Sequence, residues 1–204
     1  MAQLNYKAEL DLEGCTGCNW CDIACPSGAI TMADRKAWID DSRCIGCGYC
    51  VDRCPEDVMW MTKREEPLEL PVGLFIDEET QKQARELAEK AGISADHALC
   101  PCAPMNALPA AAAIVMGAQN IEDVSAMTGM RGGCKIYCVA PTLRLLEAAG
   151  RDMTPPKGFR WYDLTLNMMD LEGSEVDGEQ GSWLAEDLDH YQLRKDAQAE
   201  GSQS

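Results

Sequence analysis

The residues of this chain that can carry chemistry are its cysteines, and eight of them form one motif that occurs twice. Each copy spells Cys-x-x-Cys-x-x-Cys-x-x-x-Cys-Pro, and the second copy follows 29 residues after the first. Three closely spaced thiolates can bind three iron corners of a cubane, while the fourth cysteine of each run ligates the other cluster. The spacing predicts two [4Fe–4S] sites with these ligands: Cys15, Cys18, Cys21 and Cys54 in one, and Cys44, Cys47, Cys50 and Cys25 in the other.

The neighbours of the cysteines repeat as well. Gly17 and Gly46 each precede the second cysteine of their run, where a tight loop needs a positive φ or a close approach. Pro26 and Pro55 follow the fourth cysteine and restrict its backbone to an extended geometry. An internal repeat of this kind predicts a pseudo-twofold domain. Two other uses of cysteine fit the motif less well. Zinc sites use pairs of cysteine pairs and not triplets with a fourth cysteine before proline, and disulfide frameworks are typical of small secreted chains.

With this motif, residues 1–66 resemble the bacterial two-[4Fe–4S] ferredoxin family. The sequence pattern around the cysteines predicts a strand over 5–12, a hairpin of 29–32 with 36–39, and a strand over 58–62 that pairs with the first. Four aromatic residues near the cysteines are expected to pack as ordinary core: Trp20, Trp38, Tyr49 and Trp60.

A second cysteine motif begins further along the chain. Cys100-Pro-Cys102 is followed by 31 residues and then by Cys134-x-x-x-Cys138. Between the pairs we expect helices over 107–116 and 121–127, capped by Asn106 and Asn120, and a third helix from Cys138 to residue 149. Four thiolates brought together in this way suit a [2Fe–2S] cluster or a zinc ion, and cysteine spacing does not choose between them.

This second motif resembles the [2Fe–2S] domain of bacterioferritin-associated ferredoxins over residues 98–150. The resemblance implies a [2Fe–2S] cluster on Cys100, Cys102, Cys134 and Cys138. The family has two residues between its last two cysteines, whereas this chain has three. The extra residue leaves zinc, a third cubane or no metal as alternatives.

The composition of the chain bears on its compartment in the cell and on the classes of partner that it can bind. The chain has 204 residues and a net charge of −16, and residues 161–193 hold nine acidic side chains and no Lys or Arg. No apolar run approaches the roughly 20 residues of a membrane span, and we see no signal peptide. We therefore expect a cytoplasmic protein that meets redox partners with basic docking surfaces, and neither nucleic acid nor membrane.

These patterns predict an α+β chain of four parts. Residues 1–66 form a pseudo-twofold ferredoxin domain, and 67–92 form a linker and an amphipathic helix over 77–91. The pattern that predicts the linker, two prolines and no clear period, begins already at residue 63 and runs to residue 73. Residues 93–150 form a small all-α [2Fe–2S] module, and 151–204 form an irregular, partly disordered acidic tail.

No phosphate-binding loop, nucleotide fingerprint or His-based nucleophile set occurs in the sequence. We therefore expect an electron carrier and not an enzyme: a ferredoxin, or the electron-relay subunit of an oxidoreductase complex, that passes single electrons between a reductase and a partner enzyme. The alternatives are an adaptor for iron–sulfur assembly or iron mobilisation, and a redox sensor.

Overall fold

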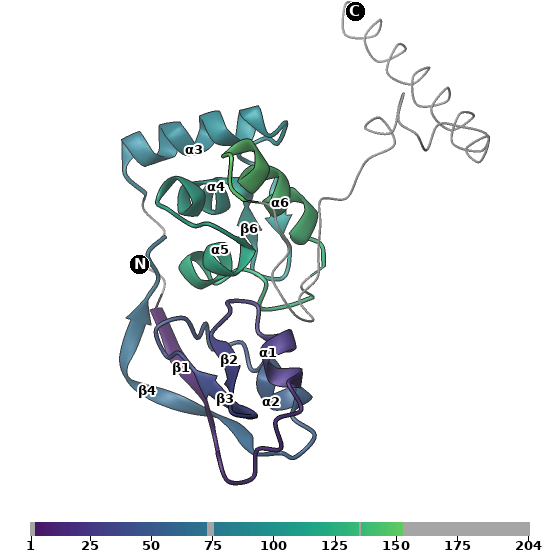
Figure 1. Ribbon diagram of the computed structural model, residues 1–204. Coiled ribbons are helices and arrows are strands. Elements are labelled where there is room, and N and C mark those ends of the chain that lie inside the picture. Colours follow the sequence, from purple (N-terminus) through teal and green to yellow (C-terminus); the bar gives the residue numbers. More distant parts are fainter. Residues whose placement is uncertain (1–2, 73–75, 135, 153–204) are drawn as a thin grey trace, which may run out of the picture. The chain divides into compact units, whose positions relative to one another are not determined.

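The computed structural model describes residues 3–72, 76–134 and 136–152, and within them it holds short helices and three two-stranded sheets (Figure 1). The predicted α+β class is confirmed. Most of the predicted acidic tail, 151–204, lies outside the described residues, and so does its expected disorder. The division into four parts stays a prediction.

Residues 1–66, which we name the ferredoxin part after the family that they resemble, have strands near both ends that pair in one antiparallel sheet. Strand β1 (Gln3–Leu10) lies against β4 (Met59–Glu69), as predicted, with Ala8 opposite Met61. However, β4 continues well past residue 62, so the expectation of an unstructured linker from residue 63 is wrong as far as Glu69. The register shifts between Leu4 and Tyr6, which lets the strand tolerate Pro67 and its missing N–H.

The second sheet is the predicted hairpin of β2 (Ile30–Ala33) and β3 (Lys36–Ile39). Asp34 and Arg35 connect the strands, and both have a positive φ, 51° and 58°. Two successive positive φ angles are those of a type I′ turn, whose twist matches that of the strands it joins. The prediction of this hairpin is confirmed.

Two five-residue helices begin one residue before the third cysteine of each triplet and were not predicted. Helix α1 (Trp20–Ala24) carries Cys21, and α2 (Tyr49–Arg53) carries Cys50, at the same position in each repeat. The helices contact each other. The cysteine after each helix is extended, as the following proline predicts. The internal repeat of the sequence is thus also a repeat of structure.

The core of this part contains several of the cysteines themselves. Its buried members are Ala8, Cys21, Ala29, Ile30, Ala37, Cys44, Cys50 and Met59. Because these side chains come from both repeats and from all four of the strands β1 to β4, the two copies share one core and pack as a single body.

Four helices build the rest of the described chain: α3 (Glu78–Lys90), α4 (Ala107–Val115), α5 (Ile121–Thr128) and α6 (Val139–Ala148). All four were predicted. Helix α3 packs on α4, with Ala84 and Ala88 fully buried. A short hairpin of β5 (Ala98–Cys100) and β6 (Met105–Asn106) also lies here, so the expected all-α module is wrong in this detail.

The helix caps differ in one respect from the prediction. The Asn120 side chain caps α5 by accepting from the Asp123 N–H at 2.8 Å, as expected. Asn106 precedes α4 but makes no side-chain cap hydrogen bond. It occupies the predicted N-cap position and pairs with Ala98 at the end of β6, so the position is confirmed but the capping hydrogen bond of its side chain is not formed.

Candidate metal centres

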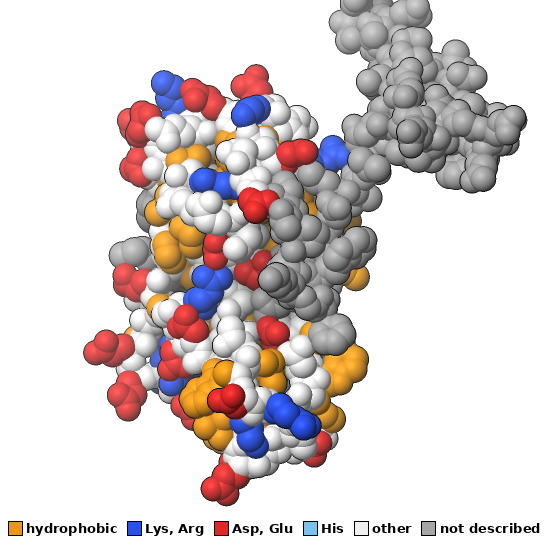
Figure 2. Space-filling model, viewed as in Figure 1, with side chains coloured by type: hydrophobic (Ala, Val, Ile, Leu, Met, Phe, Trp, Pro, Cys, Tyr) orange, Lys and Arg blue, Asp and Glu red, His pale blue; other side chains and the backbone are white. Residues whose placement is uncertain are grey.

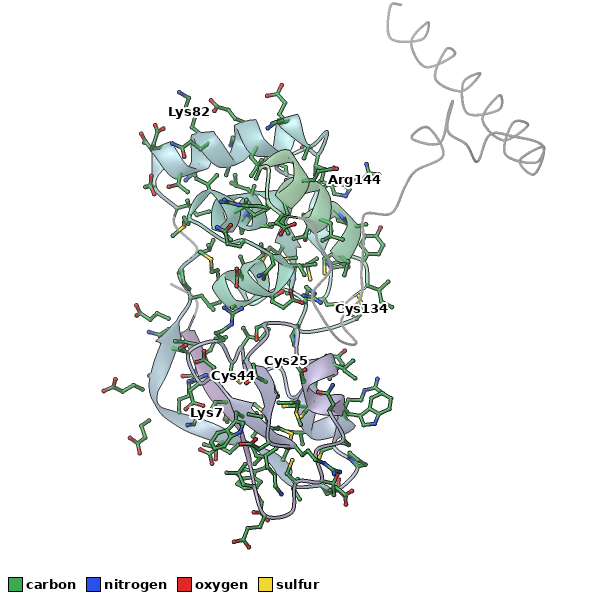
Figure 3. The ribbon with its side chains drawn as sticks, viewed as in Figure 1. Lys7, Cys25, Cys44, Lys82, Cys134 and Arg144 are labelled. Atoms are coloured by element: carbon green, nitrogen blue, oxygen red, sulfur yellow. The ribbon has the colours of Figure 1, made fainter. Side chains whose placement is uncertain are left out.

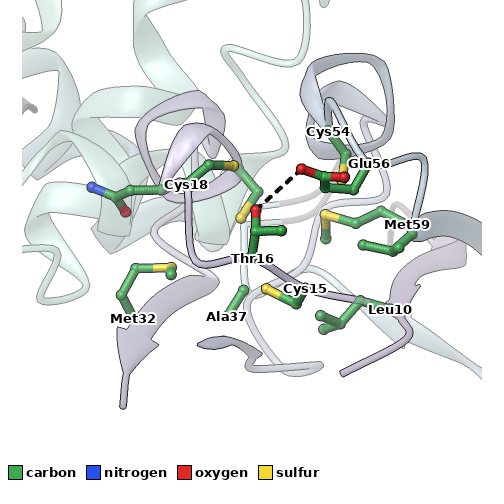
Figure 4. A pocket seen from close by; sticks show the side chains of 12 residues that line it. Leu10, Cys15, Thr16, Cys18, Met32, Ala37, Cys54, Glu56 and Met59 are labelled. Atoms are coloured by element: carbon green, nitrogen blue, oxygen red, sulfur yellow. Dashed lines mark hydrogen bonds between the residues drawn. The ribbon is translucent and has the colours of Figure 1, made fainter. Parts of the chain in front are cut away.

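Four cysteines line a cavity in the ferredoxin part, which we name the first site (Figure 4). Cys15, Cys18 and Cys21 come from the first repeat, whereas Cys54 comes from the end of the second. The space inside, counted out to its opening, is about 340 Å³. This grouping is the one that the crossed arrangement predicts, in which the fourth cysteine of one repeat joins the other triplet.

The first site is walled mainly by apolar side chains. Besides the cysteines, three polar residues line it, Thr16, Asn19 and Glu56. The other lining residues are apolar: Leu10, Met32, Ala37, Val58 and Met59. The Thr16 hydroxyl donates to the Glu56 carboxylate at 3.4 Å across the opening, which joins the two repeats (Figure 4). A thiolate set within an apolar wall suits an iron–sulfur cluster, because the wall limits solvent access and so tunes its potential.

A second cavity of about 320 Å³, which we name the second site, mirrors the first. Cys44, Cys47 and Cys50 line it with Cys25, and Figure 3 labels Cys25 and Cys44 beside each other. The backbone N–H of Ala29 donates to the Cys25 sulfur at 3.2 Å. An N–H directed at sulfur stabilises negative charge on a ligand, so this donor set fits a cluster.

The loops that carry the triplets depend on glycine. Gly17 has φ 77° and Gly46 has φ 68°, which confirms the expectation of positive φ. A Cβ at Gly17 would lie 2.2 Å from the Arg35 carbonyl oxygen, and one at Gly46 would lie 2.6 Å from that of Tyr6. Both the dihedral angle and the close backbone contact therefore exclude a side chain at either position.

Two basic side chains hold the triplet loops in place, and sequence reasoning missed them. Lys36 Nζ donates to the Cys15 carbonyl oxygen at 2.6 Å, and Arg64 Nη2 donates to the Cys44 carbonyl oxygen at 2.8 Å. The separations in sequence, 21 and 20 residues, are almost the same. That near-repeat of a basic residue was the signal that could have found them.

Burial affects how the cysteines ionise. It raises the pKa of the Cys21 thiol to about 11 and that of Cys50 to about 12. Since a metal-bound cysteine is a thiolate, loading the sites with iron must displace these protons. The positive charge of iron compensates for the unfavourable burial of the thiolates.

The third cysteine set has two buried and two exposed members, and we name it the third site. It consists of Cys100, Cys102, Cys134 and Cys138. Cys100 at the end of β5 and Cys138 before α6 are 2% and 1% exposed. Cys102 and Cys134 are exposed, and the Cys134 N–H donates to the Cys102 sulfur at 3.3 Å. Burial and the neighbouring Cys100 raise the pKa of Cys138 to about 12. The folded chain thus brings together the two pairs that sequence spacing predicted to meet.

Three of the four aromatic residues expected in the core lie at the surface. Trp20 is 55% exposed, Trp38 is 53% exposed and Trp60 is 44% exposed, so the packing prediction is wrong for them. Only Tyr49 is partly buried. The small side chains Ala8, Ala29 and Ala37 occupy the core around the cysteines, and hydrophobic side chains show at the surface of this part (Figure 2).

Two kinds of feature are absent from the part of the chain that the structure describes. Within the described residues, no group of three or more His, Cys, Asp or Glu side chains is arranged to hold a single metal ion. In the same ranges, no helix is both long and apolar enough to cross a membrane.

Comparison with known proteins identifies the ferredoxin part. A family model described as a 4Fe-4S dicluster domain matches residues 7–56, which include every cysteine of the first and second sites. The match supports a ferredoxin-like 4Fe-4S domain with at least one [4Fe–4S] cluster and an iron–sulfur electron-transfer role. No curated protein matches the chain. The resemblance of residues 98–150 to bacterioferritin-associated ferredoxins stays a prediction.

Proposed function

We propose that the protein is an electron carrier with three clusters, a [4Fe–4S] cluster at each of the first and second sites and a [2Fe–2S] cluster at the third. The observation that carries this proposal is the division of eight cysteines into two cavities, each with three ligands from one repeat and one from the other. When bound, the clusters supply one-electron transfer, and the protein sets their potentials.

The chain contributes shape, charge and exclusion of water. Lys36 and Arg64 fix the triplet loops through carbonyl oxygens, so the cysteine sulfurs stay in place when charge changes. The N–H of Ala29 stabilises the Cys25 thiolate, and apolar side chains keep solvent from the first site. A rigid site that needs little rearrangement favours fast transfer of single electrons.

The proposed partners are redox proteins with basic docking surfaces, met either as a free ferredoxin or within an oxidoreductase complex. The net charge of −16 supports this choice, because opposite charges steer encounter. Acidic side chains stand out over β4 in Figure 2. The proposed location is a reducing compartment such as the cytoplasm, which suits cysteines that serve as cluster ligands and not as disulfide partners.

A redox titration tests the proposal. The protein, purified and reconstituted without oxygen, should take up electrons reversibly at defined potentials and pass them to cytochrome c, a one-electron acceptor. Signals that bleach irreversibly on reduction, or reduced protein that transfers no electrons, would refute the carrier role.

The exposure of Cys102 and Cys134 favours a second candidate, an adaptor that hands over a cluster or iron from the third site. Exposed ligands are accessible to an attacking thiol of an apo-protein. In that case, mixing with an apo-ferredoxin should move iron from the third site within minutes, whereas a carrier retains its iron through repeated redox cycles.

A further inference from the structure

Contacts between the helical part and the ferredoxin part lie beside the second site. Arg43, which precedes Cys44, donates through Nη2 to Asp123 of α5 at 2.9 Å. The same guanidinium donates to the Ser27 carbonyl oxygen, two residues after Cys25. This ion pair therefore joins α5 to two ligand-bearing segments of the second site.

Arg131 forms a second contact of this kind from the chain after α5. Its Nη1 donates at 3.0 Å to the carbonyl oxygen of Pro26, the residue that follows Cys25. The side chain is almost fully buried with Glu122, whose carboxylate lies 3.4 Å from Nη1. A buried ion pair thus holds the start of the third-site loop against a ligand segment of the second site.

The loop that follows Arg131 connects the two cysteine sets directly. A Cβ on Gly132 would lie 3.6 Å from the Cβ of Cys47, a ligand of the second site. The Tyr49 hydroxyl donates to the Gly133 carbonyl oxygen. On its other side, Gly133 packs so closely on Cys102 that a Cβ there would lie 2.3 Å from the Cβ of that cysteine. The loop residues Gly132 and Gly133 therefore fill the space between Cys47 and Cys102 by close packing.

We propose that Gly132–Cys134 is the bridge through which electrons pass between the second and third sites, and that Tyr49 is the residue that positions it. The second site then stands in the middle of a series, because α1 and α2 each contain a cysteine of one of the first two sites and are followed directly by a cysteine of the other. This inference rests on the proposed function, since it needs a redox group at both ends.

The proposed step is the transfer of one electron, and it involves no other chemical change. One electron leaves the reduced group at the second site, which is oxidised by one, and enters the oxidised group at the third site, which is reduced by one. No bond to the protein forms or breaks. An external one-electron donor, dithionite in the experiment below, supplies the electron to the chain.

The choice of glycine follows from the two close contacts. At Gly133, any side chain would collide with Cys102 and move a ligand of the third site. At Gly132, a methyl group would fit in ordinary van der Waals contact with Cys47, but a larger side chain would push the loop away. We therefore expect Gly132→Val to separate the sites while leaving both ligand sets complete.

The test compares the full-length protein with two bridge variants and one control. Tyr49→Phe keeps the ring and removes the hydroxyl, and Gly132→Val widens the gap. Tyr6→Phe is the matched control, because Tyr6 belongs to the same part but is 53% exposed. Each protein is reconstituted anaerobically and its iron content checked. It is then reduced with dithionite and examined by electron paramagnetic resonance and by rapid-mixing absorbance.

In the unchanged protein and in Tyr6→Phe, we expect magnetic interaction between the reduced second and third sites and rapid equilibration of electrons between them. In Tyr49→Phe and Gly132→Val, the interaction should weaken and equilibration should slow severalfold, with iron content and cluster spectra unchanged. Rates and interactions unaffected in both bridge variants would overturn the bridge while leaving the carrier role intact. A third site without a reducible group would overturn the bridge together with the three-cluster proposal.

Discussion

The buried ion pair of Arg131 and Glu122 offers a quantitative test of how the two parts of the chain are held together. Their side chains are 8% and 9% exposed, and Arg131 also donates to the Pro26 carbonyl oxygen. Arg131→Met keeps most of the aliphatic bulk and removes the charge. It leaves the Glu122 carboxylate buried without its cation and the carbonyl without this donor.

Removal of one partner of a buried ion pair costs about 3–5 kcal/mol. With a urea dependence of about 2 kcal/mol per molar, the unfolding midpoint of Arg131→Met should fall by roughly 1.5–2.5 M. The control is Arg85→Met, which breaks a surface pair with Asp96 whose side chains are 51% and 75% exposed. That variant should stay within about 0.5 kcal/mol of the unchanged protein.

The assay is anaerobic urea unfolding of the reconstituted full chain, followed by circular dichroism. The double variant Arg131→Met with Glu122→Met should be more stable than Arg131→Met alone, because it no longer buries a carboxylate that has lost the Arg131 cation. The reasoning is refuted if Arg131→Met shifts the midpoint no more than Arg85→Met does, or if the double variant is the less stable of the two.

Three further predictions follow from particular residues. Cys54→Ala should remove the first-site cluster and spare the second, and Cys25→Ala should do the reverse; optical and paramagnetic spectra that show the nearer cluster lost instead would contradict the crossed ligation. Asn120→Ala should lower the free energy of unfolding by about 1 kcal/mol, whereas Asn106→Ala, which removes no side-chain cap, should cost clearly less in the same urea titration. Deletion of 173–204 should leave iron content unchanged and slow transfer to a basic partner at low salt only, since screening acts over about 8 Å at 0.15 M; a rate unaffected at every ionic strength would remove the steering role.

Local patterns in the sequence predicted most elements that position the sites. The hairpin around Asp34 was predictable because two short apolar runs flank a two-residue connection. The cap at Asn120 was predictable because side-chain capping depends on residues within one helical turn. Cysteine spacing predicted the grouping of the ligands, since cluster ligation restricts how far apart thiolates lie along the chain.

Features that depend on distant parts of the chain were not predictable in this way. Helices α1 and α2 are only five residues long, which is too short to show a hydrophobic period. Asn106 pairs with Ala98 in the β5–β6 hairpin and its side chain makes no cap hydrogen bond, which the local sequence did not indicate. The ion pair of Arg43 with Asp123 spans 80 residues, and no local pattern indicates it.

The exposure of the tryptophans has the same origin. Trp38 and Trp60 lie on small two-stranded sheets whose buried side chains are alanine, isoleucine and methionine. A large aromatic side chain next to a cysteine motif suggests a core position, but the space around the cysteines must remain available for a metal group. The tryptophans therefore lie on the outer faces of the sheets, where they can contact a partner.

The central claim of three clusters is tested most directly by counting iron, sulfide and zinc in the anaerobically purified full chain. Two [4Fe–4S] clusters and one [2Fe–2S] cluster require ten iron and ten sulfide per chain, with no zinc. Eight iron and eight sulfide with one zinc would contradict the assignment of the third site, and four iron and four sulfide would contradict the paired sites of the ferredoxin part.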